Sequence, residues 1–293
     1  MMIPDPLRIR LEEVLNSSRL SMTPASGGDI HQAFIVNTDD QQFFVKFNPD
    51  PMAIRIFESE TRGLEELAPW VLTPKIHGLE SLQDQGAYLM MDYYPAGTYS
   101  DAFWEQAGQD LARLHTRTSS LFGCAYPSYL GTIPLESYQS SQWSETYING
   151  YLAPSMKVIR EKSVFDSKTE ELWSRVEDRI PYLILDDEPP VLLHGDLWSG
   201  NLYCTADEQP LWIDPSPRYG HREVDLAMTT LFGGFSSSFY SSYSRHFKEL
   251  DGWSIREKIY QLYPLLAHVA MFGLAYLDQT IHTMKKILED SGN

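Results

Sequence analysis

Three oxygen-bearing side chains in the later part of the sequence have the types and spacing needed for phosphoryl transfer. Asp196 and Asn201 stand five residues apart in a polar loop after the apolar run 191–193, and Asp214 ends a second apolar run. In phosphoryl transfer one carboxylate takes the proton of the attacking hydroxyl, while an amide and a second carboxylate hold Mg²⁺. We therefore predict that Asp196 is the base and that Asn201 and Asp214 bind the metal. A turn and a strand-end cap are the plainer explanations for either motif alone.

The first ninety residues have the pattern of a small lobe that holds a nucleotide. Residues 30–37 and 41–47 predict a β-hairpin, and Gly27 and Gly28 stand at its mouth. Glycines at such a place let backbone amides approach a phosphate closely, although a plain turn explains the pair equally well.

Two charged residues of this lobe are expected to be buried. Strand alternation places Lys46 inside the second strand of the hairpin, and Glu60 lies on the apolar stripe of a helix predicted over 54–68. Buried charges are rare unless they are paired. We predict that Lys46 pairs with Glu60 and also contacts the phosphates of the nucleotide. The alternative is an edge lysine and a solvated glutamate.

The lobe is expected to end at a hinge. The apolar run 88–91 is followed by a stretch with Pro95 and Gly97, between two halves of different composition. Backbone groups of Met91, Asp92 and Tyr93 could then bind the adenine edge, although an ordinary loop has the same local pattern. This divides the chain into a nucleotide-binding lobe, residues 1–92, and a catalytic and acceptor-binding lobe, residues 93–293.

The second part of the sequence is predicted to be mostly helical. Helices are expected from Ser100 onwards and over 255–263 and 265–287, whereas 121–142 has the composition of a long irregular connection.

Three polar residues of this part are candidates for supporting roles. Asp225 begins a helical run, which it could simply cap. In a kinase-like arrangement Asp225 would also hold the backbone of the catalytic loop, and His194 is a further candidate for a supporting role beside the catalytic residues. His268 stands among apolar neighbours, where a lone histidine is usually a satisfied core residue.

Composition indicates a globular protein that does not bind nucleic acid. Of the 293 residues, 43% are apolar, and 40 acidic against 23 basic residues give a net charge of −17. This charge is unfavourable for binding a phosphate backbone. Cys124 and Cys204 form no metal-binding pattern, the first twenty residues lack an apolar signal segment, and no apolar run is long enough for a membrane helix. We expect a cytoplasmic protein without membrane partners, as a monomer or weak dimer.

Several strings of the sequence resemble the fructosamine/ketosamine 3-kinase family, which is related to aminoglycoside phosphotransferases and choline kinases. The most specific strings are HGDLWSGN, from residue 194, and REVDLAMTTLFGGF, from residue 222. The resemblance implies an α+β, bilobal protein-kinase-like fold with a small N-terminal antiparallel-sheet lobe and a larger, mostly helical C-terminal lobe. It also implies ATP- and Mg²⁺-dependent phosphorylation of the 3-hydroxyl of a ketosamine, free or on a protein.

Residue by residue, the resemblance implies the roles proposed above for Asp196, Asn201, Asp214, Lys46 and Glu60, and for the hinge. It adds Trp198 and His268, which match positions that line the sugar pocket of the family.

The chain departs from the family pattern at Asp29, over the stretch 216–218, and at Pro264 and Ala267. All of these positions except Asp29 are expected near the acceptor pocket, so the identity of the acceptor stays open. An acid at position 29 would mildly repel phosphates. The alternatives are a kinase for another small-molecule hydroxyl, such as an aminoglycoside, choline or a sugar, and an inactive nucleotide-binding scaffold.

Overall fold

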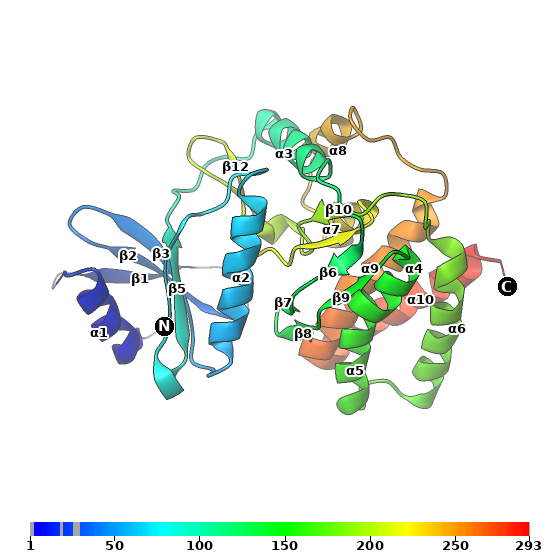
Figure 1. Ribbon diagram of the computed structural model, residues 1–293, viewed down its shortest axis with the longest axis horizontal. Coiled ribbons are helices and arrows are strands. Elements are labelled where there is room, and N and C mark those ends of the chain that lie inside the picture. The colour runs from blue at the N-terminus through cyan, green and yellow to red at the C-terminus, as the bar shows by residue number, and fades with distance from the viewer. Residues whose placement is uncertain (1–2, 18–19, 26–29, 293) are drawn as a thin grey trace. The chain divides into compact units, whose positions relative to one another are not determined.

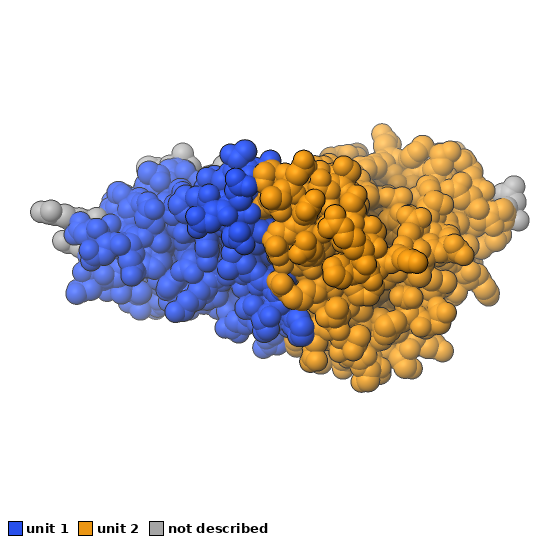
Figure 2. Space-filling view, turned by 90° about the horizontal axis from the view of Figure 1, so that it is seen from above, with its two compact units in different colours: residues 1–99, 202–214 blue, residues 100–201, 215–293 orange. Residues whose placement is uncertain are grey.

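The computed structural model describes residues 3–17, 20–25 and 30–292, which divide into two compact units (Figure 2). Unit 1 contains the described residues of 1–99 together with 202–214, and unit 2 contains 100–201 with the described residues of 215–293. The boundary expected after residue 92 stays a prediction. None of the helices in the described ranges is long and apolar enough to cross a membrane.

Unit 1 is built on a five-stranded antiparallel sheet in the order β1-β2-β3-β5-β4 (Figure 1). Its strands are β1 Ser21–Ala25, β2 Gln32–Asn37, β3 Gln42–Asn48, β4 Ile76–Ser81 and β5 Ala87–Asp92. The β2–β3 hairpin predicted from the sequence is confirmed, with Asn37 opposite Gln42.

The two faces of this sheet are covered by different helices. Helix α1, Asp5–Val14, packs over a cluster that includes Phe43, Val45 and Phe47. Helix α2, Ala53–Leu67, packs over the opposite face, to which Phe44 contributes (Figure 1). Alternation along β3 therefore separates two apolar layers, as its sequence predicts, and places Lys46 on the α2 side.

A hairpin from the later sequence also belongs to unit 1. Its strands are β11 Leu202–Cys204 and β12 Pro210–Trp212. The backbone N–H of Trp212 donates to the Leu72 carbonyl at 2.9 Å, and the N–H of Gly97 donates to the Cys204 carbonyl at 2.9 Å. These bonds join β11–β12 to the segments that flank α2 and β5. The short 3₁₀ turn η1, Gln83–Gln85, connects β4 and β5.

Unit 2 is mostly helical. Its α-helices are α3 Asp101–Leu114, α4 Trp143–Thr146, α5 Ala153–Glu161, α6 Ser167–Leu183, α7 Glu223–Leu231, α8 Ser237–Tyr243, α9 Trp253–Phe272 and α10 Leu277–Asp290. A π-helical segment, η2 Tyr147–Leu152, joins α4 to α5, and 3₁₀ turns lie at η3 Ser199–Asn201 and η4 Gly273–Tyr276. The predicted Ser100 cap of α3 is confirmed, because its side chain accepts from the Phe103 N–H.

The predicted irregular connection over 121–142 is wrong. It contains four short strands, β6 Phe122–Cys124, β7 Ser128–Leu130, β8 Ile133–Leu135 and β9 Tyr138–Ser140. Two of them complete a four-stranded sheet in the order β10-β13-β6-β9, in which β10 is Val191–Leu193 and β13 is Arg218–Gly220. This small sheet supports the segment that leads into Asp196.

The predicted break between the last helices at Pro264 is also wrong. Helix α9 continues through Pro264 and ends at Phe272, just before Gly273, whose φ is +67°. A proline inside a helix costs about 3 kcal/mol relative to alanine. The neighbours Tyr263 and Leu265 are fully buried, so packing of this helix in the core of unit 2 offsets that cost.

Candidate active site

Unit 1 holds a lysine between two carboxylates. Lys46 lies on β3, Glu60 lies on α2 and Asp214 follows β12. The Lys46 Nζ lies 2.7 Å from Glu60 Oε1 and also forms an ion pair with Asp214 Oδ1. Lys46 and Glu60 are only 7% and 8% exposed. The ion pair predicted between Lys46 and Glu60 is therefore present, and Asp214 joins it from a distant part of the sequence.

The charges of this triad shift one another's pKa values. Burial opposes the charged form of Lys46, but the carboxylates of Asp214 and Glu60 outweigh it and raise the pKa of the ammonium. Burial would raise the pKa of Asp214, but the Lys46 charge lowers it below its usual value. Burial raises the pKa of Glu60 to about 8, against the opposing effect of Lys46. Lys46 and Asp214 are thus held as a charged pair.

The backbone of Asp214 adopts an uncommon conformation. Its φ is +54°, in the left-handed region that residues other than glycine rarely occupy. Aspartate is among the residues that tolerate this region best, and such residues are often found at functional sites. The turn after β12 therefore carries local strain at the residue whose carboxylate contacts Lys46.

The predicted hinge lies at the end of β5. Met91 and Asp92 belong to that strand and pair with β3. The Asp92 N–H donates to the Lys75 carbonyl at 2.9 Å. Tyr93 is the first residue beyond the strand, and no hydrogen bond of its backbone is found within residues 3–17, 20–25 and 30–292. Of the three predicted hinge residues, Tyr93 has the backbone groups best placed to bind a ligand.

Unit 2 carries the loop with Asp196 and Asn201. The Asn201 Nδ2 donates to the Asp196 carbonyl at 2.9 Å and to the Asp196 carboxylate at 3.1 Å. The Asp196 N–H in turn donates to His194 Nδ1 at 3.3 Å. His194 and Asn201 are buried, whereas Asp196 is half-buried. The structure thus brings these predicted residues together and leaves Asp196 partly exposed.

Asp225 fixes the backbone of this loop. Its carboxylate accepts the N–H of His194 at 2.8 Å and the N–H of Gly195 at 2.9 Å. It does not cap its own helix, since α7 has Arg222 at its N-cap and no side-chain cap. Gly195 has a φ of +81°, and a Cβ there would lie 2.0 Å from the carbonyl oxygen of Ser216. Only glycine fits this turn beside the carboxylate.

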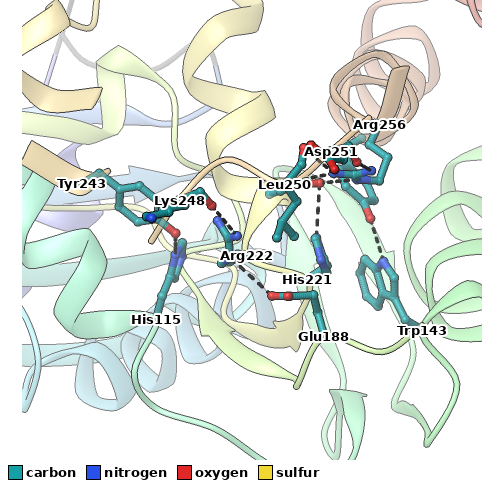
Figure 3. Close-up of polar contacts among 12 residues, drawn as sticks. His115, Trp143, Glu188, His221, Arg222, Tyr243, Lys248, Leu250, Asp251 and Arg256 are labelled. Atoms are coloured by element: carbon teal, nitrogen blue, oxygen red, sulfur yellow. Dashed lines mark hydrogen bonds and ion pairs between the residues drawn. The ribbon is translucent and has the colours of Figure 1, made fainter. Parts of the chain in front are cut away.

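Beside Asp225 lies a buried histidine, His115. His115 Nε2 lies 3.2 Å from the Asp225 carboxylate. On the other side of the ring, Nδ1 lies 2.8 Å from the Tyr243 hydroxyl, as Figure 3 shows. Burial lowers the pKa of His115, which favours the neutral ring. Because a carboxylate only accepts, Nε2–H donates to Asp225 and Nδ1 accepts from Tyr243. No local pattern in the sequence indicates this contact, because the two residues are 110 positions apart.

Trp198 and His268, the two residues expected at the sugar pocket, lie in unit 2 and are linked by a third aromatic ring. The Phe232 ring centroid is 6.4 Å from that of Trp198 and 5.2 Å from that of His268. His268 Nδ1 lies 2.7 Å from the Pro264 carbonyl and must donate to it. The sequence analysis did not single out Phe232.

Other predicted positions are either internal or outside the described residues. Arg218 is buried, donates to the Gly150 carbonyl at 2.8 Å and stacks 4.8 Å above the Tyr151 ring. It ties β13 to η2. Gly27 and Gly28, with the neighbouring Asp29, lie outside the described residues.

Comparison with known proteins identifies the family. The sequence profile described as fructosamine kinase matches residues 9–290. The chain belongs to the fructosamine kinase family. It is 34% identical over 275 residues to a probable ketoamine kinase of Enterococcus faecium, covering 92% of this chain and 96% of that protein. It is 31% identical over 306 residues to the ketosamine-3-kinase of Mus musculus, covering 94% of this chain and 98% of that protein.

Solved structures of this family and of more distant proteins share the fold. A structure from Thermobifida fusca described as a candidate fructosamine-3-kinase has a TM-score of 0.83 at 28% identity, covering 96% of this chain and 98% of that one. An aminoglycoside phosphotransferase in a ternary complex with ADP and hygromycin B has a TM-score of 0.68 at 13% identity, covering 98% of both chains. The predictions of this family and of a kinase-like α+β fold are therefore confirmed.

Proposed function

We propose that the protein is an ATP-dependent kinase that phosphorylates the 3-hydroxyl of ketosamines. The observation that carries the proposal is the Lys46 ammonium, which is buried and held between Glu60 and Asp214. A buried cation in this setting is suited to contact phosphates, since its position and charge are both fixed. The family match and the mouse ketosamine-3-kinase support the choice of acceptor.

ATP is the phosphoryl donor in this proposal. The kinase-like neighbour solved with ADP supports a nucleotide as ligand. Lys46 would contact its phosphates, with Glu60 as the partner that keeps the ammonium in place. The backbone of Tyr93 would bind the adenine edge, because the strand ladder and Lys75 already use groups of Met91 and Asp92.

The chain offers suitable donors for Mg²⁺. Asp214 is held ionised by Lys46, and Asn201 uses its amide nitrogen to bind Asp196, so that its amide oxygen is the atom for a hard cation. Leu202 pairs with Trp212, so the chain enters and leaves the β11–β12 hairpin at neighbouring positions. We infer that Asn201 and Asp214, just outside these ends, hold the metal, which would neutralise charge on the phosphates.

Asp196 acts as the base that accepts the proton of the sugar hydroxyl. Asn201 orients its carboxylate, and Asp225 fixes the two preceding backbone amides, so that little motion is needed at the moment of transfer. In this scheme His194 supports the loop through the N–H of Asp196.

Replacement of the base tests the mechanism. Asp196→Asn keeps the shape of the side chain but cannot take a proton, so kcat should fall by about 10²- to 10⁴-fold. Nucleotide affinity, measured by calorimetry, should stay within about twofold of the wild-type value, since Lys46 and Asp214 are untouched. Turnover near the wild-type rate would reject Asp196 as the base.

A panel of acceptors tests the substrate class. Fructosamines and ribulosamines should be phosphorylated in preference to choline, an aminoglycoside and free sugars, with ATP consumption as the readout. Phosphorus NMR of the product should place the phosphate on the 3-hydroxyl. A clear preference for choline or an aminoglycoside would reject ketosamines as the acceptor, and the kinase chemistry would stand.

A further inference from the structure

Five aromatic rings form a connected cluster beside the catalytic loop of unit 2. Successive ring centroids lie 6.4 Å apart for Trp198 and Phe232, 5.2 Å for Phe232 and His268, and 4.6 Å for His268 and Tyr276. Phe272 completes the cluster, with its centroid 5.7 Å from His268 and 5.9 Å from Tyr276. We call these five residues the aromatic wall.

The aromatic wall is partly exposed, unlike the aromatic core of the same unit. Trp198, Phe232 and Phe272 are 37%, 38% and 41% exposed, whereas Trp143 and Tyr147 in the core are fully buried. Rings in a core are explained by packing alone. Contiguous apolar rings left open to solvent are more often part of a binding site.

The wall is continuous with the proposed catalytic base. Trp198 stands two residues after Asp196, and its indole lies against Gly200, where a Cβ would come within 2.2 Å of the ring. The turn after Phe232 packs closely against the same loop, because a Cβ on Gly234 would lie 2.7 Å from the Ser199 side chain. The first rings of the wall are thus anchored to the loop that carries Asp196.

We propose that the aromatic wall binds the protonated amine of the acceptor through its ring faces. The proposal rests on the proposed function, because a ketosamine carries a secondary amine that is separated from C3 only by C2 and C1. A hydroxyl at C3 held at Asp196 therefore brings the amine close to Trp198.

The chemistry of the amine fits rings better than carboxylates. An alkylated ammonium is weakly hydrated and spreads its charge over the adjoining CH₂ groups, which is the kind of cation that aromatic faces bind. The net charge of −17 adds a long-range attraction for such a cation. The wall would therefore select acceptors that carry a charged, substituted nitrogen at C1 over neutral sugars of the same shape.

A pair of acceptors that differ in one atom tests the proposal. 1-Deoxy-1-propylaminofructose carries the ammonium, and 1-O-propylfructose replaces its nitrogen by an ether oxygen. The wild-type protein should bind the amine about tenfold more tightly than the ether near neutral pH, the fold-change expected for a cation over aromatic rings. Calorimetry without nucleotide measures this ratio independently of turnover.

Leucine substitutions separate ring electrostatics from apolar contact. In the double variant Phe272→Leu with Tyr276→Leu, which keeps apolar bulk, the ratio of amine to ether affinity should fall to less than about threefold while ether affinity changes little. Tyr182→Leu, at a highly exposed tyrosine on α6, is the matched control and should keep the wild-type ratio.

The outcomes distinguish this proposal from the proposed function. An unchanged ratio in the double variant, or an equal loss of affinity for both compounds, would overturn the role of the rings as an ammonium site. Absence of phosphorylation on both compounds, with the ratio still lost in the double variant, would reject the ketosamine kinase activity and support the ammonium site.

Discussion

Unit 1 holds its key group by charge, whereas unit 2 holds its key loop by hydrogen bonds to the backbone. In unit 1 the Lys46 ammonium is placed by the carboxylates of Glu60 and Asp214. In unit 2 the carboxylate of Asp225 faces two amide N–H groups and a neutral histidine, His115. A ligand phosphate can compete for Lys46, but no ligand is needed to complete the contacts of Asp225. The first arrangement suits binding and the second suits positioning.

Among the substitutions that test this contrast, the largest effect is expected from removal of Asp225. Asp225→Ala leaves the buried N–H groups of His194 and Gly195 without their acceptor, at a cost of about 1–3 kcal/mol each. Urea unfolding should show this loss, and kcat should fall by about 10²-fold or more as the loop loosens. Nucleotide affinity should be retained. Asp178→Ala, at an exposed carboxylate on α6, is the control. If Asp225→Ala weakens nucleotide binding as strongly as turnover, the contrast between the units is wrong.

A smaller effect is expected for Glu60, and it should fall on nucleotide affinity more than on kcat. Glu60→Gln keeps the shape but, at pH 9, above the raised pKa of Glu60, removes one of the two charges beside Lys46. Nucleotide affinity at that pH should therefore fall about tenfold, from the loss of about 1.5 kcal/mol of charge-assisted hydrogen bonding. The kcat at saturating ATP should change less than the affinity. Glu65→Gln, at an exposed position of the same helix, should change neither. A fall in kcat with unchanged affinity would contradict the role given to the ion pair.

Acid should act on unit 2 through a buried neutral histidine. His221 packs against Trp143 (Figure 3) and against Tyr260. Burial lowers the pKa of His221 to about 3. The unfolded chain takes up this proton near pH 6.5, whereas the folded chain does not until about pH 3. Its contribution is therefore complete above pH 6.5 and is lost on acidification, by up to about 1.4 kcal/mol per pH unit.

His221→Phe tests this contribution. It removes the group that must stay neutral and keeps the ring stacking, so the free energy of unfolding should decline less steeply between pH 6.5 and pH 4 than in the wild type. Urea titrations at a series of pH values measure the slope. His282→Gln, at an exposed histidine of α10, should leave the slope unchanged. Equal slopes for His221→Phe and the wild type would mean that His221 is protonated in the folded state.

The smallest effect is expected at Tyr243, which bonds to His115, the histidine that in turn bonds to Asp225. Tyr243→Phe removes only the hydroxyl that donates to His115 Nδ1, a loss of about 1 kcal/mol in the free energy of unfolding. Because Asp225 keeps both backbone bonds, kcat should fall by no more than a few fold. Chemical denaturation and ATP turnover measure the two quantities. A loss of turnover as large as that of Asp225→Ala would show that the loop depends on His115 more than on Asp225.

Local patterns predicted the parts of the site that single elements determine. Strand alternation placed Lys46 on the side of α2, and helical spacing placed Glu60 on the buried stripe, so their contact followed from the sequence. The apolar runs before Asp196 and Asp214 likewise correspond to β10 and β12. These features depend on periodicity within a few residues, which a sequence displays directly.

Features that depend on distant pairing were missed. Strand β6 has only three residues and pairs with β13, far along the chain, so no alternating run indicates it. The bond from His115 to Asp225 was missed for the same reason, because it joins two residues that are far apart in the sequence. Helix α9 passes through Pro264 because its neighbours are buried, which outweighs the local preference. The spacing of His268, Phe272 and Tyr276 by four residues could have indicated the aromatic wall.

The membership of the β11–β12 hairpin in unit 1 has a consequence for how this chain is made and dissected. The ribosome synthesises residues 1–99 well before residues 202–214. The nascent N-terminal segment therefore lacks at first the backbone partners of Leu72 and Gly97. Completion of unit 1 therefore has to wait for the chain to return to it. A gene fragment that ends at residue 99 encodes an unfinished unit, and an exchange of unit 1 with a relative has to transfer the hairpin as well.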